Sequence, residues 1–196
     1  MTNDRPVHQR SRVELYLDHL DRISGGVEPR FLPIESTHPG LKGLTAITYL
    51  DLPEPGLLTA LTYGISLANH PEWRHGKPEL CLCVRSHDVV WARAMAFIAE
   101  QLRESCPFAY GDTIDFGDLI SPESEMTAFV IFAPAVLDRA DALNIDVGDR
   151  LPINISGCFP IHDTERRFIQ EKGLEAFWTL DWDPYDVRRA PAVSAE

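Results

Sequence analysis

Two stretches, Thr62-Tyr63-Gly64-Ile65-Ser66 and Glu79-Leu80-Cys81-Leu82-Cys83-Val84-Arg85, decide the fold of this chain. Their aliphatic, aromatic and β-branched residues favour β-strands. In the second stretch, leucines and a valine on one face alternate with two cysteines on the other, so both faces are largely apolar. We therefore expect an interior strand that is covered on both sides of a sheet.

More strands are predicted on either side of these two stretches. Residues 44–50 and 57–66 flank a turn rich in proline, acidic residues and glycine, which predicts an antiparallel hairpin. Residues 27–43 carry three prolines and two glycines and are expected to form a loop. Later apolar runs predict a short strand within residues 110–120 and longer strands at 126–132 and 151–159.

Helices are predicted at the two ends and in the middle of the chain. Apolar residues recur every three or four positions in residues 7–24, before Gly25, and in residues 88–104, where Asp88 precedes the first turn. Residues 162–173 predict a short helix that Asp163 or Thr164 caps, and residues 174–178 predict a further helical turn.

This order of elements predicts an α+β fold with a mixed, largely antiparallel β-sheet flanked by helices. We divide the chain into an N-terminal helix packed on the domain (residues 1–26), the domain itself (27–180) and a C-terminal tail (181–196). The tail is expected to lose order toward Glu196.

Composition narrows the classes of function. The 196 residues carry a net charge of −12, which disfavours nucleic-acid binding and favours solubility and encounter with basic partners. The N-terminus has no apolar signal-peptide segment, and no apolar run is long enough to span a membrane, so we expect a cytoplasmic protein. The four cysteines form no CxxC pair and are expected to be reduced thiols, mostly buried.

No catalytic, metal-binding or cofactor motif is present in the sequence. Pro71 opposes a helix at the loop histidines, and their spacing is not that of a zinc motif. The His-Asp pairs at 87–88 and 162–163 fit helix starts better than a metal phosphohydrolase site. One enzymatic alternative stays open, a small-molecule hydrolase with a site built from four polar groups: His70, Glu72, Cys158 and His162.

The chain resembles the suppressor of fused domain family. The resemblance rests on short pieces that follow one another in the family's order: Thr62-Tyr63-Gly64-Ile65-Ser66, Pro78-Glu79-Leu80-Cys81-Leu82, Trp91, Gly111-Asp112-Thr113-Ile114, and Pro160-Ile161 followed by Glu165. It implies an α/β domain with a mixed sheet and no known catalytic role. The animal member of the family clamps a peptide segment of transcription factors, whereas some bacterial relatives are proposed immunity partners of secreted toxins.

The resemblance and the acidic charge together predict a non-enzymatic protein-binding domain, in one version an immunity protein that binds a basic toxin domain directly. This chain is too short to include the second domain of the animal protein, so clamping between two domains cannot be carried over. The candidate partner contacts are polar and aromatic residues of the loop, the last helix and the tail: His70, Glu72, Trp73, His75, Glu165, Trp182 and Tyr185. Ordinary packing is the alternative role for these residues. A scaffold that pairs with itself is a third possibility, and sequence gives no oligomeric state.

Overall fold

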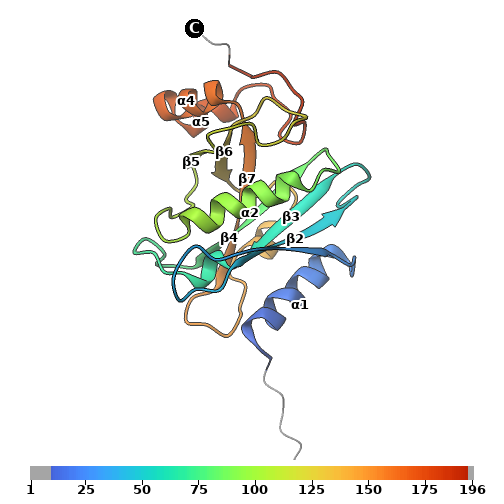
Figure 1. The fold of residues 1–196 in the computed structure, drawn as a ribbon, viewed down its shortest axis with the longest axis vertical. Coiled ribbons are helices and arrows are strands. Elements are labelled where there is room, and N and C mark those ends of the chain that lie inside the picture. Colours follow the sequence, from blue (N-terminus) through green and yellow to red (C-terminus); the bar gives the residue numbers. More distant parts are fainter. Residues whose placement is uncertain (1–9, 194–196) are drawn as a thin grey trace, which may run out of the picture.

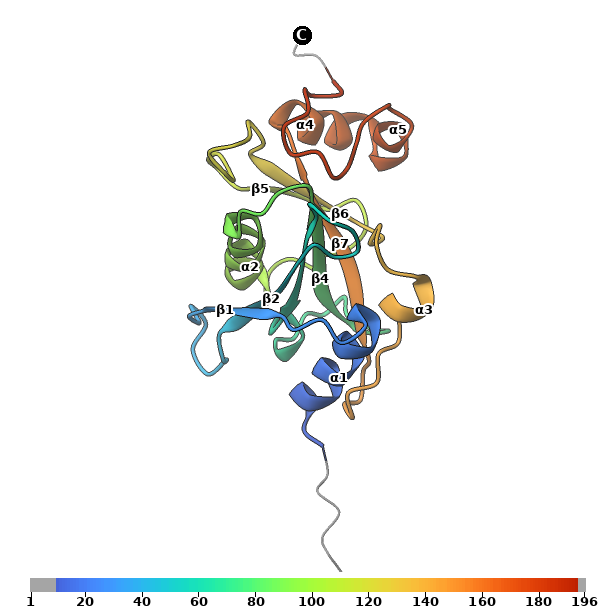
Figure 2. The same cartoon turned by 90° about the vertical axis from the view of Figure 1, so that its right-hand side faces the viewer.

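The computed structural model describes residues 10–193 and is built around one mixed sheet (Figures 1 and 2). The seven strands lie in the order β1-β2-β3-β4-β7-β6-β5, and every neighbouring pair is antiparallel except β4 and β7. Their bounds are β1 (Arg30–Ile34), β2 (Leu44–Leu50), β3 (Leu58–Tyr63), β4 (Lys77–Val84), β5 (Thr113–Asp115), β6 (Ala128–Phe132) and β7 (Ile153–Ile161). The predicted α+β class with a mixed, largely antiparallel sheet is confirmed.

Helices cover both faces of the sheet and one of its ends. Their bounds are α1 (Arg12–Ser24), the 3₁₀ helix η1 (Ile65–Leu67), α2 (Val90–Leu102), α3 (Arg139–Ala142), α4 (Asp163–Lys172) and α5 (Leu174–Trp178). Figure 2 shows α2 on one face and α1 and α3 on the other, while α4 and α5 lie beyond the far end of β7. Each face and the far end have a hydrophobic cluster of their own.

Strand β4 lies in the interior of the sheet, as its sequence predicts. It pairs with β3 on one side and with β7 on the other. Leu80, Leu82 and Val84 pack in the cluster below α2, whereas Cys81 packs in the cluster below α1. All four side chains are at least 97% buried, because helices cover the two faces of this strand.

The predicted hairpin is present, but its second strand is shorter than expected. Strands β2 and β3 pair antiparallel, with Ile47 opposite Leu61. Residues 64–66, predicted as strand, leave the sheet at Gly64, whose φ of 137° is outside the strand region, and η1 follows. A run of apolar residues does not reveal this exit, because Ile65 is as well suited to a strand as to a buried turn.

Residues 27–43 were predicted to be a loop, and this is wrong for Arg30–Ile34. These residues form β1, which pairs antiparallel with β2 and places Pro33 opposite Thr45. Strand β1 lies at the edge of the sheet, where a residue without an N–H group is tolerated. Pro33 is therefore compatible with an edge strand, and its presence in the sequence does not exclude a strand here.

The predicted helix end is confirmed for α1, whereas the predicted caps of α2 and α4 lie one or two residues from the observed ones. Gly25 ends α1 with a φ of 69°. The N-cap of α2 is Val89 and not Asp88, although the Asp88 carboxylate accepts a hydrogen bond from the Val90 N–H at 3.0 Å. Residues 7–9 of the first predicted helix lie outside the described residues. At α4, the capping position is His162 and not Asp163 or Thr164, and its N–H donates to the Glu165 carboxylate at 2.9 Å.

Candidate functional site

The groups of the hydrolase alternative lie at opposite ends of one strand. His70 belongs to the loop before β4, whose first residue pairs with the first residue of β7. His162 follows the last residue of β7, a nine-residue strand that spans roughly 25–30 Å. A single active site cannot contain both histidines, so the geometry opposes a hydrolase built from these groups.

The thiols do not supply a nucleophile either. Burial raises the pKa of Cys158, which is 1% exposed in the core below α2, far above the ordinary range of a thiol. Burial also raises the pKa of Cys83 and of Cys106 to about 11, and that of Cys81 further still. Because only the thiolate attacks, a raised pKa disfavours each of these thiols as a nucleophile at neutral pH.

The loop between η1 and β4 is built around Trp73. Its indole ring is only 8% exposed, and its Nε1–H donates to the Pro107 carbonyl oxygen at 2.9 Å. The ring of His70 lies 5.7 Å from it, whereas the side chains of Glu72 and His75 are exposed. Trp73 is therefore a packing anchor that fixes this loop to the segment after α2, and its polar neighbours face outward.

Two hollows flank Trp73. One, of about 620 Å³, lies between this loop and the turn before β7, and the other, of about 360 Å³, lies between the loop and residues 107–110. Trp73 and Arg74 line both hollows. Glu72 and His75 line the smaller one, so three of the predicted contact residues share a concave surface.

Glu165 serves the fold at the other end of β7. Its carboxylate accepts hydrogen bonds from both terminal nitrogens of Arg189, at 2.5 and 2.8 Å, and from the Ala192 N–H. Burial on its own would raise the pKa of Glu165, but the bonds from Arg189 and Ala192 outweigh it and hold that pKa below its ordinary value. Glu165 thus holds the tail onto α4, and no local sequence pattern identifies Arg189 as its partner.

The two aromatic candidates in the tail are packed onto the domain. Trp182 lies 4.9 Å from the ring of Phe177 and 5.4 Å from that of Trp178, with the Arg189 guanidinium 4.7 Å from its centroid. The Tyr185 carbonyl oxygen accepts a hydrogen bond from the Arg85 N–H, just beyond the end of β4. The seven candidates therefore form two groups, one at each end of the parallel pair β4 and β7.

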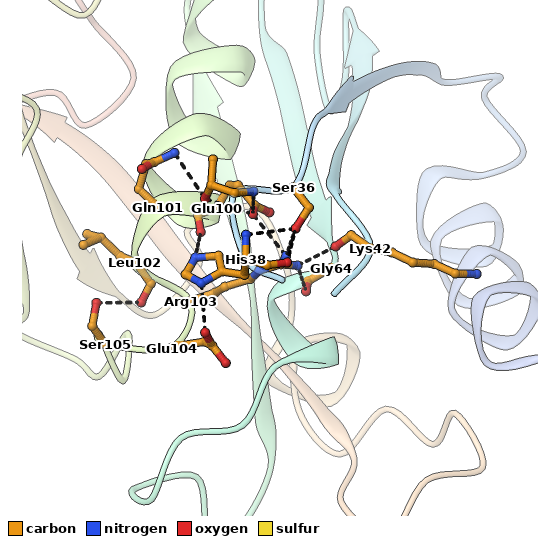
Figure 3. A network of polar contacts seen from close by, with 11 residues as sticks. Ser36, His38, Lys42, Gly64, Glu100, Gln101, Leu102, Arg103, Glu104 and Ser105 are labelled. Carbon is orange, nitrogen blue, oxygen red and sulfur yellow. Dashed lines mark hydrogen bonds and ion pairs between the residues drawn. The ribbon is translucent and has the colours of Figure 1, made fainter. Parts of the chain in front are cut away.

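A buried ion pair fixes the segment before β2 (Figure 3). Arg103 and Glu100 are 3.1 Å apart and fully buried. Figure 3 shows Arg103 reaching Ser36 and the carbonyl oxygens of Lys42 and Gly64, at 2.8–3.1 Å. These groups hold backbone that crosses the end of α2, and this is a structural role.

The described residues contain neither a metal-type cluster nor a membrane-spanning helix. Within residues 10–193, no three His, Cys, Asp or Glu side chains gather as they would around a metal ion. No helix in that part of the chain is long and apolar enough to cross a bilayer.

The profile of the suppressor of fused protein (SUFU) family matches residues 39–190, which is most of the sequence. This chain belongs to the suppressor of fused family. Among curated proteins, no sequence matches it.

Solved structures of the suppressor of fused family share the fold. A homologue from Neisseria gonorrhoeae FA 1090 aligns with a TM-score of 0.70 at 18% identity, over 93% of this chain and 97% of the other. A chain in the Sufu–Fu complex aligns with a TM-score of 0.67 at 12% identity, over 93% of this chain and 92% of the other. Drosophila Suppressor of Fused aligns with a TM-score of 0.63 at 13% identity, over 90% of this chain and 50% of the Drosophila chain.

The two motifs that carry the resemblance to the suppressor of fused family meet in space. Glu79 of the second motif is fully buried. Its carboxyl group accepts hydrogen bonds from the Thr62 hydroxyl at 2.7 Å and from the Gly64 N–H at 2.9 Å. The Ser66 N–H donates to the same group at 3.1 Å, and its hydroxyl also donates there. The first motif thus supplies hydrogen bonds to the buried glutamate of the second. Both motifs therefore have a structural role in joining β3 to β4.

Proposed function

We propose that this chain is a non-enzymatic domain that binds another protein and that its partner is a basic polypeptide. The observation that carries the proposal is membership of the suppressor of fused family over residues 39–190. One solved relative was crystallised as the Sufu–Fu complex, an assembly with a second protein. The burial of the thiols and the separation of the histidines support a role without bond chemistry.

An acidic surface surrounds Arg85, at the end of β4. The Arg85 guanidinium lies 2.9 Å from the Asp183 carboxylate. The hydrogen bond and charge of Asp183 raise the pKa of Arg85, and the charges of Asp186 and Glu54 raise it further. His87, two residues on, contacts Asp51 at 3.3 Å. We call these four carboxylates, Asp51, Glu54, Asp183 and Asp186, the acidic rim.

The rim combines charge with aromatic surface, as protein-binding sites often do. Tyr185 lies between Asp183 and Asp186 in the sequence, and its pKa is raised by burial and by charges that include those of Asp183 and Glu54. Surface carboxylates speed the encounter with a basic partner, while a half-buried aromatic ring lengthens the life of the complex. In the immunity version of the proposal, the rim covers the basic active site of a toxin domain.

Co-purification tests the proposal. The tagged chain is co-expressed with the product of each neighbouring gene, and we expect one of them to elute as a stoichiometric complex whose dissociation constant rises with salt. The double variant Glu54→Gln and Asp183→Asn should raise the dissociation constant of that complex about tenfold or more. It removes two negative charges from a charge-complementary interface.

The control variant is Glu72→Gln, which removes an exposed carboxylate of the loop at the opposite end of β4. It should leave the affinity unchanged. If Glu72→Gln weakens the complex and the rim variant does not, the loop is the contact surface. If no neighbouring product binds and none of them is a toxin that the chain neutralises, the proposal fails.

A further inference from the structure

The larger hollow beside Trp73 gathers positive charge in an acidic protein. Arg74, Lys77 and Arg150 line it, with Asp149 as the carboxylate in its wall. Across the whole sequence, acidic residues outnumber lysine and arginine by 30 to 18. Even so, none of these three cations forms an ion pair with any residue of the described chain.

The carboxylate in the wall is already occupied. Asp149 accepts a hydrogen bond from Arg12 Nε at 2.5 Å, and Arg12 Nη2 donates to the Ser66 hydroxyl at 2.7 Å. The third nitrogen of this guanidinium, Nη1, is buried and has no hydrogen-bond partner. Arg12 therefore adds a fourth positive charge near the hollow and pairs with the one carboxylate that lines it.

Lys77 is held in place at the base of the hollow. Its Nζ donates to the Ala68 carbonyl oxygen at 2.8 Å and to Asn69 Oδ1 at 3.0 Å, which leaves one of its three hydrogens for a ligand. Burial lowers the pKa of Lys77, and the charge of Arg12 lowers it further. The charge of Asp149 raises that pKa in part, and an anion bound in the hollow would act in the same direction.

We propose that this hollow binds a small phosphorylated organic molecule, with the phosphate on Arg74, Lys77 and Arg150. A phosphate group carries close to two charges and three acceptor oxygens, which suits three separate cations. The volume of about 620 Å³ is in the range of small-molecule sites, and Trp73 and Leu151 offer apolar surface to the organic part. A nucleic acid is disfavoured, because a long polyanion would meet the net charge of −12.

Inorganic pyrophosphate is the probe, and amide chemical shifts of the full chain are the readout. We expect saturable shifts at residues 69–77 and 149–152 that weaken as salt is added. Arg74→Gln and Arg150→Gln, both changes of exposed side chains, should each raise the dissociation constant about tenfold. Lys77 is not replaced, because its hydrogen bonds also hold the loop.

Arg93→Gln is the matched control, since it removes an exposed arginine on α2, away from the hollow. It should leave the dissociation constant unchanged. Shifts that do not saturate at millimolar pyrophosphate, shifts elsewhere in the chain, or an equal loss of affinity in Arg93→Gln would each overturn the site. The proposed protein binding uses a different surface and a different assay, so either proposal can fail alone.

Discussion

At the scale of single residues, Glu79 joins the end of β3 to the start of β4. Replacing Glu79→Ala leaves the Thr62 hydroxyl and the N–H groups of Gly64 and Ser66 buried without an acceptor. Each lost partner costs about 1–3 kcal/mol, so we expect the free energy of unfolding to fall by roughly 3 kcal/mol or more. Urea denaturation at neutral pH measures this change.

The comparison variant for Glu79 is Glu72→Ala in the adjacent loop, where the same carboxyl group is exposed. Its denaturation midpoint should match that of the parent chain, because surface substitutions away from packed features have little effect. Equal midpoints for Glu79→Ala and the parent would show that the buried carboxyl group does not hold these strands.

Glu165 makes stability depend on pH. Its pKa in the folded chain is below the ordinary 4.5, because the hydrogen bonds from Arg189 and Ala192 outweigh the effect of burial. The stabilisation is therefore complete at neutral pH, declines as pH falls below 4.5, and is lost once pH is below the folded pKa. Glu165→Gln should lower the free energy of unfolding by about 2–3 kcal/mol at neutral pH, with the gap to the parent closing in acid.

Denaturation curves of the parent and Glu165→Gln across this range give the gap directly. Glu171→Gln, an exposed change on the same helix, serves as the reference and should give no gap that depends on pH. A constant gap between Glu165→Gln and the parent from neutral to acid would contradict the assignment of the Arg189 contact.

Sequence patterns identify apolar core residues better than buried polar ones. The apolar periodicity of residues 88–104 predicts a helix with one apolar face, and Trp91 and Met95 on that face are fully buried, because apolar side chains of one helix face share one environment. Glu100 and Arg103 lie beside that face and are still fully buried, since the segment of Ser36 to Lys42 covers them. That cover comes from a loop about 60 residues away in sequence, and no local pattern contains it.

At the scale of elements, the turn from β3 into η1 depends on Gly64. A side chain there would place its Cβ 2.9 Å from Leu44 Cα, and the φ of 137° is one that only glycine adopts readily. Gly64→Ala should therefore lower the free energy of unfolding by about 2 kcal/mol or more. Thermal unfolding followed by circular dichroism provides the measurement.

Gly40→Ala separates crowding from backbone strain in this experiment. Gly40 also has a positive φ, of 80°, but a Cβ at this position meets no atom within 4 Å. We expect a smaller loss than at Gly64, about 1 kcal/mol. If the two variants lose equal stability, the contact with β2 has no part in the effect.

Elements were predictable where their own residues determine them. The hairpin of β2 and β3, the interior strand β4 and the helix α2 have strong apolar patterns and were predicted near their observed positions. Strand β1 was not predicted, because its own sequence contains a proline and has no strong strand pattern. Backbone hydrogen bonds with β2 stabilise it instead. For Trp73 and Trp182 the sequence left partner contact and packing as alternatives, because their packing partners lie far away in the sequence.

At the scale of the whole molecule, charge is unevenly distributed. The parallel pair β4 and β7 has the acidic rim near its last residues and the hollow with Arg74, Lys77 and Arg150 near its first. A net charge of −12 describes only the average of these surfaces. Opposite ends of the domain therefore suit ligands of opposite charge, since exposed charges act over about 10 Å at moderate salt.

The extent of the folding unit is a whole-molecule property that truncation can measure. Ending the chain after Leu180 would remove Trp182 from its aromatic cluster, Val187 from a site that is 2% exposed, and Arg189 from Glu165. Breaking a buried ion pair costs about 3–5 kcal/mol, and the loss of buried Val187 and of the partly buried Trp182 adds to this, so the shortened chain should be barely stable or unfolded. A chain ending at Leu180 that unfolds at the parent midpoint would instead show that residues 181–196 are an appendage, as the division proposed from the sequence has it.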